Sequence, residues 1–303
     1  MNKQSYNQQI VDPKNISVVV QGAVDKLNTP ICIESIRKNL PGAEIILSTW
    51  EGSSVEDLNY DILVLNKDPE GLYCSIKNCY DNTNRQIVST LAGTKVANRE
   101  FVLKIRSDCL LKSNKFLSYF TLYHHRNQHF ELFKQRILAC TLFTKRFLDY
   151  KSKIPTPFHL SDWFIFGLKE DLLFLWDIPT IADADYMGYN ECIKDSYEGL
   201  WFTNKYTPEQ YIFFNCVSKK YKVKFSDMLD FNSHNISFSE NIFANNFILI
   251  SPKNLDMLIL KEPYKSQIKN YEAFIEKQPL CLYDEEGFEV LYKNYVLEKN
   301  NEV

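Results

Sequence analysis

Short apolar runs alternate with amphipathic segments along the first hundred residues of the chain. Four runs are brief and rich in aliphatic residues, as buried strands are: 16–20, 44–49, 61–65 and 101–105. Between them, residues 29–40 and 82–97 carry apolar side chains at helical spacing. This order predicts an α/β fold of Rossmann type, with a mostly parallel sheet flanked by helices.

Capping residues mark the expected helix ends. Thr29 and Pro30 predict a helix start, with Thr29 as the N-cap, and Pro41 and Gly42 end that helix. The pair Thr207 and Pro208 gives the same signal and predicts a helix over 207–219.

The second half of the chain has a less regular pattern. We expect residues 115–150 to be partly helical, 160–168 to form a strand or a buried turn, 225–246 to be loop, and 270–300 to be helical. There is no internal repeat and no low-complexity linker, so one domain over 1–303 is expected, with a helical or irregular C-terminal region.

Composition narrows the class of protein. Hydrophobic residues make up 45% and charged residues 24%, which is typical of a globular chain, and the net charge of −3 disfavours a nucleic-acid partner. The eight cysteines include no CxxC pair, so free thiols in a reducing compartment are expected rather than a zinc site. Residues 1–14 are polar and no apolar stretch is long enough to span a bilayer, so we expect a cytoplasmic protein.

Polar residues follow each predicted strand. Ligands of parallel α/β sheets bind beyond the carboxyl ends of the strands, so these residues are the first candidates for a site. They are Gln21-Gly22, Trp50-Glu51-Gly52, Asp68-Pro69 and Arg106-Ser107-Asp108. The first strand leads into Gln21-Gly22-Ala23 without a GxGxxG motif, and a GxxxxGK[ST] loop is absent, which disfavours a Rossmann dehydrogenase and a P-loop kinase.

Asp108 is the central candidate of this set. Arg106 lies two residues before it and Lys104 four, so all three project to one side if the strand continues. A carboxylate between cations suits a phosphate site with a divalent Mn or Mg ion, which would neutralise a departing diphosphate. The alternative is that Asp108 caps a turn. An Asp-x-Asp metal motif would have an acid where Arg106 stands, so Arg106 could itself replace part of the charge of the metal.

Several of these segments, taken in order, resemble the WavE family of lipopolysaccharide-synthesis proteins. They are Val18-Val19-Val20-Gln21-Gly22, residues 35–52 (SIRKNLPGAEIILSTWEG), Asn84-Arg85-Gln86-Ile87 and Lys104-Ile105-Arg106-Ser107-Asp108, with a weaker match at Ser161-Asp162-Trp163-Phe164. The resemblance implies a glycosyltransferase of the GT-A type that acts in lipopolysaccharide, lipooligosaccharide or capsule assembly. Residues of about 16–110 would form the nucleotide-sugar-binding part, and about 111–303 the acceptor-side part.

The resemblance also implies roles for single residues. Gln21, Gly22 and Trp50 would form the nucleotide pocket, Asp68 would bind the ribose or base, and Asp108 a metal or the ribose. Asn84, Arg85 and Gln86 would face the nucleotide-sugar. Three simpler interpretations stay open: Trp50 as core, Asp68 as the cap of a turn before Pro69, and Arg85 as a solvated cation.

An inverting transferase needs a carboxylate that deprotonates the acceptor hydroxyl. Asp162, just before an apolar run, and Glu209, in the first turn of the helix expected at 207–219, are the candidates. Glu209 has an alternative explanation, because acidic residues are common in first turns. His159 and His234 are candidate third metal ligands, although a lone histidine is more often structural.

Two other functions stay open. One is transfer of another nucleotide-activated group, such as an alditol phosphate, to a surface polymer. The other is a non-catalytic scaffold with a degenerate transferase fold, which the missing first acid of the metal motif would favour. The family picture implies a lipid-linked glycan acceptor and peripheral contact with the inner face of the cytoplasmic membrane.

Overall fold

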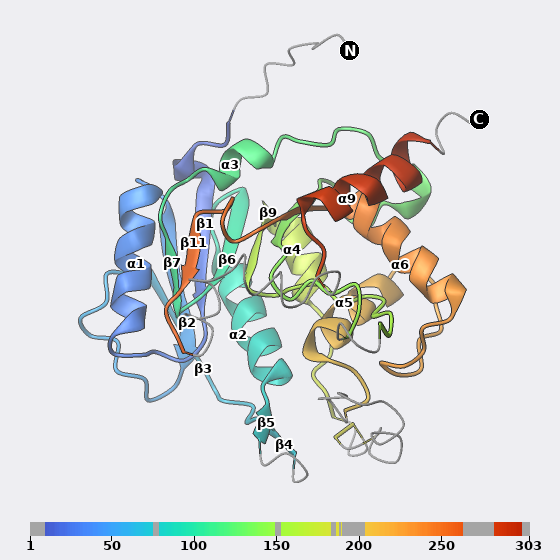
Figure 1. The fold of residues 1–303 in the computed structure, drawn as a ribbon. Coiled ribbons are helices and arrows are strands. Elements are labelled where there is room, and N and C mark those ends of the chain that lie inside the picture. Colours follow the sequence, from blue (N-terminus) through green and yellow to red (C-terminus); the bar gives the residue numbers. More distant parts are fainter. Residues whose placement is uncertain are drawn as a thin grey trace.

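A seven-stranded sheet forms the centre of the molecule. The computed structural model describes residues 10–74, 79–148, 153–182, 186–187, 189, 204–262 and 282–298. The strands of the central sheet run in the order β3–β2–β1–β6–β9–β8–β10, and helices cover both faces (Figure 1). The predicted α/β class with a mostly parallel sheet is therefore confirmed.

The parallel half of the sheet contains the four strands predicted from the early apolar runs. They are β1 (Ile16–Gln21), β2 (Glu44–Trp50), β3 (Ile62–Asn66) and β6 (Phe101–Arg106). In the register, Gln21 is paired with both Ser48 and Arg106. The carboxyl ends of these strands therefore meet at one edge of the sheet.

An antiparallel strand joins the two halves. β9 (Phe164–Leu168) lies between β6 and β8 (Ile137–Cys140) and is antiparallel to both, whereas β10 (Phe247–Ile250) is parallel to β8. Ile105 is paired with Phe164, so the chain that enters β9 lies beside the end of β6. The segment expected as a strand or a turn is thus a strand, and its direction brings residues 161–163 to the carboxyl edge.

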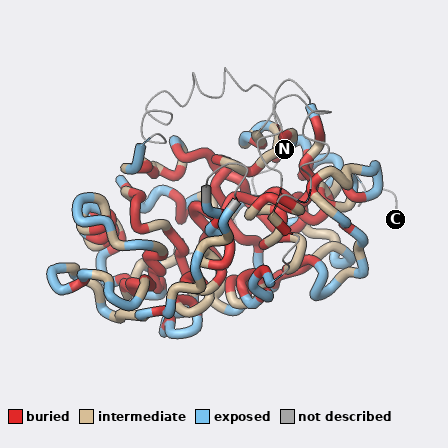
Figure 2. The backbone as a smooth tube through the Cα atoms, turned by 90° about the horizontal axis from the view of Figure 1, so that it is seen from below, coloured by how far each residue is buried: buried red, intermediate tan, exposed pale blue. Residues whose placement is uncertain are grey.

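Alternate side chains of the strands point into two apolar cores, one on each face of the sheet. Val18 and Val20 point to one core, which also contains α1 (Asn28–Asn39) and the small sheet of β7 (Cys109–Leu111) and β11 (Met257–Ile259). Val19 points to the other core. The helices around that second core are α2 (Thr83–Val96), α4 (Lys169–Trp176), α5 (Pro208–Ser218), α6 (Ser233–Asn246) and α9 (Glu285–Tyr292). Buried backbone runs through the middle of the molecule and exposed residues gather in the outer loops (Figure 2).

The remaining elements are short. They are η1 (Pro13–Asn15), β4 (Leu72–Cys74), β5 (Cys79–Asp81), α3 (Phe116–Tyr119), η2 (Gln128–Phe130) and η4 (Lys293–Leu297). The cysteines whose side chains are described, Cys32, Cys109, Cys140 and Cys216, are buried and free. Within the described ranges, no helix has the length and apolarity that a membrane crossing requires.

Residues 115–150 are partly helical, as predicted: they contain the one-turn helix α3 and the 3-10 turn η2, and also strand β8. The prediction of a loop over 225–246 was wrong, because these residues contain α6. The inner face of α6 is partly polar, which hid its helical stripe: the Asn245 side chain accepts from the Asn127 amide at 2.6 Å. Asn246 does the same for Leu132, also at 2.6 Å.

One predicted helix start is confirmed and the other is wrong. Thr207 is the N-cap of α5, as predicted, and it also forms a reciprocal capping box with Gln210. Thr29, however, lies inside α1, and Asp25 binds the first amides of that helix, those of Leu27 and Asn28. Of the helix expected over 270–300, residues 270–281 and 299–300 lie outside the described residues, and α9 and η4 cover 285–297.

Candidate active site

A cavity of about 510 Å³ opens at the carboxyl edge of the parallel strands. Its wall combines the ends of β1, β2 and β6, the segment after β3, the first turn of α2 and the segment after β11. Most of the predicted binding residues line it: Gln21, Gly22, Trp50, Asp68, Arg85, Gln86, Arg106 and Asp108. Trp50 is partly exposed in this wall, so it is not a core residue.

Arg106 and Asp108 form a two-pronged ion pair in the cavity. The Nε and Nη2 atoms of Arg106 donate to the two carboxylate oxygens of Asp108 at 2.9 and 2.7 Å. The guanidinium also lies 4.0 Å from the centre of the Trp163 ring. Burial alone would raise the pKa of Asp108, but the hydrogen bonds and charge of Arg106 outweigh it and hold that pKa below its usual value. Asp108 is therefore a fixed anion.

Arg85 and Asp68 repeat this arrangement on the opposite wall. Arg85 donates to both oxygens of Asp68 at 2.8 and 2.7 Å, and to the side-chain oxygen of Asn82 at 2.8 Å. These bonds lower the pKa of Asp68. Asp68 also accepts the amide of Glu70 at 2.9 Å, so it caps the turn around Pro69 as well. Arg85 is thus held in the cavity wall and is not a freely solvated cation.

The backbone approaches closely at Gly22. Its φ of +121° lies in a region that favours glycine, and a Cβ there would come within 3.3 Å of the Ser107 hydroxyl. That hydroxyl donates to the carbonyl of Ala23 at 2.7 Å. Beside it, the Gln21 amide donates to Ser89 of α2 at 2.9 Å. The loops after β1 and β6 are therefore locked together at the floor of the cavity.

Lys261 is a cavity residue that the sequence pattern did not reveal. It follows β11, which pairs with β7 directly after Asp108, and the amide of Leu260 donates to the Asp108 carbonyl at 2.8 Å. The positive charge of Lys261 also helps to lower the pKa of Asp108. A strand pairing across about 150 residues of chain leaves no local signal, so a motif search could not find it.

Two predicted binding residues do not line the cavity. Asn84 is buried and holds the backbone of Ile181, donating to its carbonyl at 3.0 Å and accepting from its amide at 2.7 Å. Lys104 shares a sheet face with Arg106, as expected, but it lies one step deeper and is fully buried. Asn84 and Lys104 are therefore buried residues that hold the surrounding backbone and do not face the cavity.

Lys104 pairs with the first candidate base. Its ammonium donates to the carbonyl of Asp162 and lies 3.3 Å from a carboxylate oxygen of the same residue. Burial lowers the pKa of Lys104, and the charge of Asp162 partly offsets that effect. Asp162 is itself only 5% exposed, so this ion pair is fixed in the protein interior.

Glu209 lies beside this pair. It belongs to the first turn of α5, and its side chain is 17% exposed. Burial, followed by the negative charge of Asp162, raises the pKa of Glu209 to about 7. Asp81, which accepts hydrogen bonds from the Thr83 amide and the Asn204 side chain, contributes to the raised pKa of Glu209 and was not among the predicted residues. Asp81 precedes Asn82, which lines the cavity, and Asp162 precedes Trp163, whose ring lies 4.0 Å from the Arg106 guanidinium. The acidic cluster of Asp81, Asp162 and Glu209 therefore lies beside the cavity.

The two candidate histidines are not with Asp108. His159 is buried, with its Nε2 atom 3.6 Å from Glu209, and burial holds its pKa well below the usual value, so it is neutral. His234 is exposed on α6, where it stacks on Phe238. The prediction that either one completes a metal site with Asp108 was therefore wrong: neither lines the cavity, and their own helices and loops hold them elsewhere.

The donor set around Asp108 does not fit the predicted Mn or Mg ion. Both oxygens of Asp108 accept from Arg106, and those of Asp68 from Arg85. Within the described ranges, no three His, Cys, Asp or Glu side chains form a group that could hold a metal. A divalent cation that took both oxygens of Asp108 would have to displace Arg106, and one that used a remaining lone pair would lie beside the positive guanidinium.

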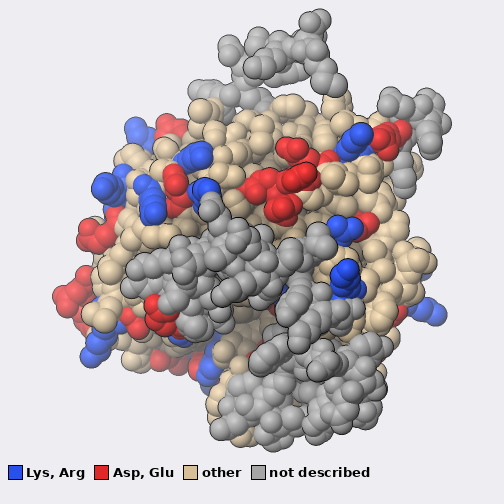
Figure 3. Space-filling model, in the orientation of Figure 1, with Lys and Arg blue, Asp and Glu red and all other residues tan. Residues whose placement is uncertain are grey.

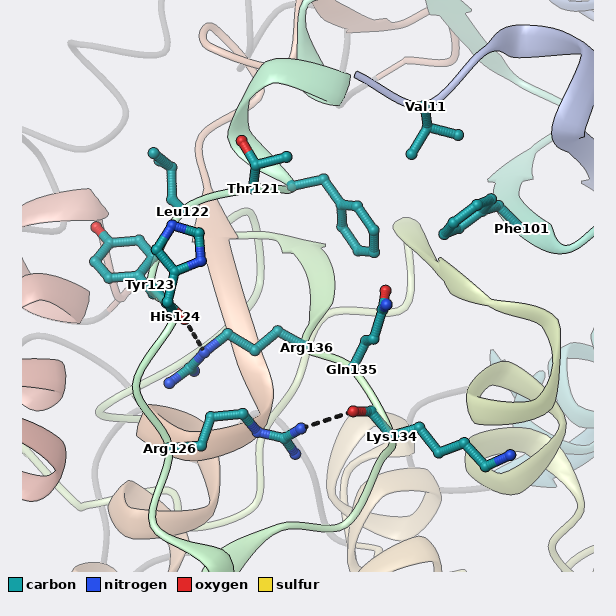
Figure 4. Close-up of a pocket in the computed structure, with 11 residues that line it drawn as sticks. Val11, Phe101, Thr121, Leu122, Tyr123, His124, Arg126, Lys134, Gln135 and Arg136 are labelled. Atoms are coloured by element: carbon teal, nitrogen blue, oxygen red, sulfur yellow. Dashed lines mark hydrogen bonds between the residues drawn. The ribbon is translucent and has the colours of Figure 1, made fainter. Parts of the chain in front are cut away.

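A second cavity, of about 350 Å³, lies near the start of β6 (Figure 4). Its arginines have structural partners. The guanidinium of Arg136 donates to the carbonyls of Tyr123, His125, Ala244 and Phe247 at 2.7, 2.7, 2.6 and 3.0 Å. None of the predicted site residues lines this cavity.

Over the described part of the face drawn in Figure 3, acidic and basic side chains are interspersed.

Comparison with known proteins gave one family. A family model described as WavE lipopolysaccharide synthesis matches residues 16–302, which is nearly the whole chain. A search of curated proteins found no match. The matched range contains both the cavity and the acidic cluster.

Proposed function

Because the chain belongs to the WavE lipopolysaccharide synthesis family, we propose that it is a glycosyltransferase that moves a sugar from a nucleotide-sugar donor to a lipopolysaccharide-type acceptor. Family membership by itself indicates a role in lipopolysaccharide synthesis. The finer assignment rests chiefly on one observation: a cavity with two arginine–aspartate pairs adjoins a carboxylate whose pKa is about 7.

The cavity has the groups that a nucleotide-sugar requires. Arg85 and Arg106 present planar guanidinium groups, which suit phosphate oxygens, and their aspartates hold them in place. Trp50 offers an aromatic face for the base. Gly22 lets a ligand approach the backbone closely. These are the roles of a donor site at the carboxyl edge of an α/β sheet.

Glu209 is our choice for the catalytic base of an inverting transfer. The acceptor hydroxyl oxygen would form a bond to the anomeric carbon, while the bond from that carbon to the phosphate oxygen breaks. The hydroxyl proton would go to the Glu209 carboxylate, and the electron pair of the broken bond would leave with the nucleotide. A base works best with a pKa near the working pH, and Glu209 meets that condition.

Asp162 has a different role in this mechanism. Its side chain is fixed by the buried pair with Lys104, and its negative charge contributes to the raised pKa of Glu209. Asp162 therefore helps to set the pKa of Glu209. Its bond from Lys104 also links the segment before β9 to β6, next to Arg106. On this account Asp162 is a positioning residue.

Binding of nucleotides tests the donor site. We would titrate UDP, CDP, GDP, ADP and CMP, together with CDP-glycerol as an alditol-phosphate donor, into the protein by calorimetry. We expect one nucleotide to bind selectively. Arg85→Gln should weaken the affinity for that nucleotide about tenfold, because a charge-assisted phosphate contact is lost. Arg99→Gln is the control, since Arg99 is exposed near the start of β6, away from the cavity.

The panel also separates the alternatives. Selective binding of CDP-glycerol over the nucleotides alone would favour transfer of an alditol phosphate. Absence of binding across the panel would contradict the transferase assignment and favour a scaffold.

A further inference from the structure

Lys261 brings a third cation to the donor cavity. The other cations of its wall, Arg85 and Arg106, each engage both oxygens of an aspartate. Lys261 comes from a distant part of the chain and is exposed in the cavity. Its flexible stem lets the ammonium follow a ligand that enters.

The backbone fixes where Lys261 starts. The three-residue pairing of β11 with β7, and the bond from the Leu260 amide to the Asp108 carbonyl, hold the residue before Lys261 against Asp108. Lys261 therefore lies on the side of the cavity that Arg106 and Asp108 share. Lys261 and Arg106 can therefore bind the same phosphate group.

The same region is poorly suited to a divalent cation. A Mg or Mn ion bound to Asp108 would lie beside the Arg106 guanidinium, which donates to both carboxylate oxygens at 2.9 and 2.7 Å, so the two positive charges would repel each other. A nucleotide leaving group still needs positive charge beside it, because the electron pair of the broken bond stays on its phosphate oxygen. Fixed side-chain cations can supply that charge without a metal.

We propose that Lys261, with Arg106, binds the phosphates of a nucleoside diphosphate-sugar donor and takes the place of a divalent metal ion. This inference rests on the proposed function. It adds that the donor carries a diphosphate, that its binding needs no metal, and that residue 261 is part of the donor site.

The test is calorimetry with the diphosphate that binds best in the panel and its matching monophosphate. Both are measured in EDTA and again with Mn, on the wild type, Lys261→Gln and Lys261→Arg. The control is Lys112→Gln, because Lys112 is exposed just after β7 and does not line the cavity.

We expect diphosphate affinity in EDTA to lie within threefold of that with Mn, and Lys261→Gln to weaken it about tenfold in both conditions. Lys261→Arg should restore most of the affinity, and Lys112→Gln should change nothing. Binding that requires Mn, equal binding of the monophosphate, or no effect of Lys261→Gln would each overturn the inference and leave the donor site standing. Failure of every nucleotide in both conditions would instead reject the proposed function.

Discussion

At the residue scale, the site combines ion pairs of two kinds. The Arg85–Asp68 and Arg106–Asp108 pairs border the cavity and are partly exposed, so under the proposed function they would exchange partners when a phosphate binds. The Lys104–Asp162 pair is buried, with side chains 0% and 5% exposed. A buried pair is costly to break because the remaining charge has no solvent. In the proposed mechanism, pairs of the first kind bind the donor, and the second kind holds Asp162 in the acidic cluster.

Removal of Lys104 tests this distinction. We expect Lys104→Met to lower the free energy of unfolding by about 3–5 kcal/mol, because Asp162 is left as a buried, unpaired carboxylate. Urea denaturation at pH 7.5 measures the change. The double variant Lys104→Met/Asp162→Asn should recover part of the loss, since it removes the orphan charge. A loss below about 1 kcal/mol in the single variant would mean that the pair contributes little.

The sequence revealed most residues of the cavity, for a simple reason. Residues such as Gln21, Arg106 and Asp108 directly follow apolar strands, and the end of a parallel strand has one position in this fold. Lys261 could not be predicted, because its place depends on a strand pairing between distant segments. Asn84 was assigned to the ligand because of its neighbours in a motif. Its helical position instead points it at Ile181.

At the element scale, α2 and β9 determine how the site is assembled. α2 carries Arg85 and Gln86 to the cavity, and it packs closely on β1 and β2 at Gly93. β9 reverses direction beside β6 and so delivers Asp162 to the carboxyl edge. The apolar pattern predicted α2 and left residues 160–168 as a strand or a buried turn. The direction of β9 depends on its pairing with β6 and β8, which no local pattern encodes.

The contact at Gly93 gives a prediction for α2. A Cβ at this position would come within 2.5 Å of Val19 Cγ1 and 3.1 Å of Ser48 Cβ, so the helix would have to shift from the sheet. We expect Gly93→Ala to lower the free energy of unfolding by about 1–3 kcal/mol despite the better helix propensity of alanine. Thermal or urea denaturation measures it, with Lys95→Ala on the exposed side of α2 as the control. Stabilisation by Gly93→Ala would show that this packing is looser than described.

At the scale of the whole molecule, the proposed function divides between the two halves of the sheet. The parallel strands β1, β2, β3 and β6 lead to the cavity that is proposed to bind the donor. Asp162 and Glu209 of the acidic cluster come from segments beyond β6: the approach to β9 and the start of α5. Transfer requires that a donor and an acceptor meet, and the adjoining cavity and cluster at one sheet edge provide a place for that meeting.

The most direct test of this account is the pH dependence of sugar transfer by wild-type protein and Glu209→Gln. The assay would use the donor identified by nucleotide binding and truncated lipopolysaccharide as the acceptor, with release of the nucleotide as the readout. Glu209 acts as a base only when it is deprotonated, and its pKa is raised to about 7. The wild-type rate should therefore fall as the pH drops through about 7, and Glu209→Gln should lose about 10²–10⁴-fold in rate while it still binds the nucleotide. Transfer by Glu209→Gln at the wild-type rate, or no transfer by either protein with any donor, would contradict the account.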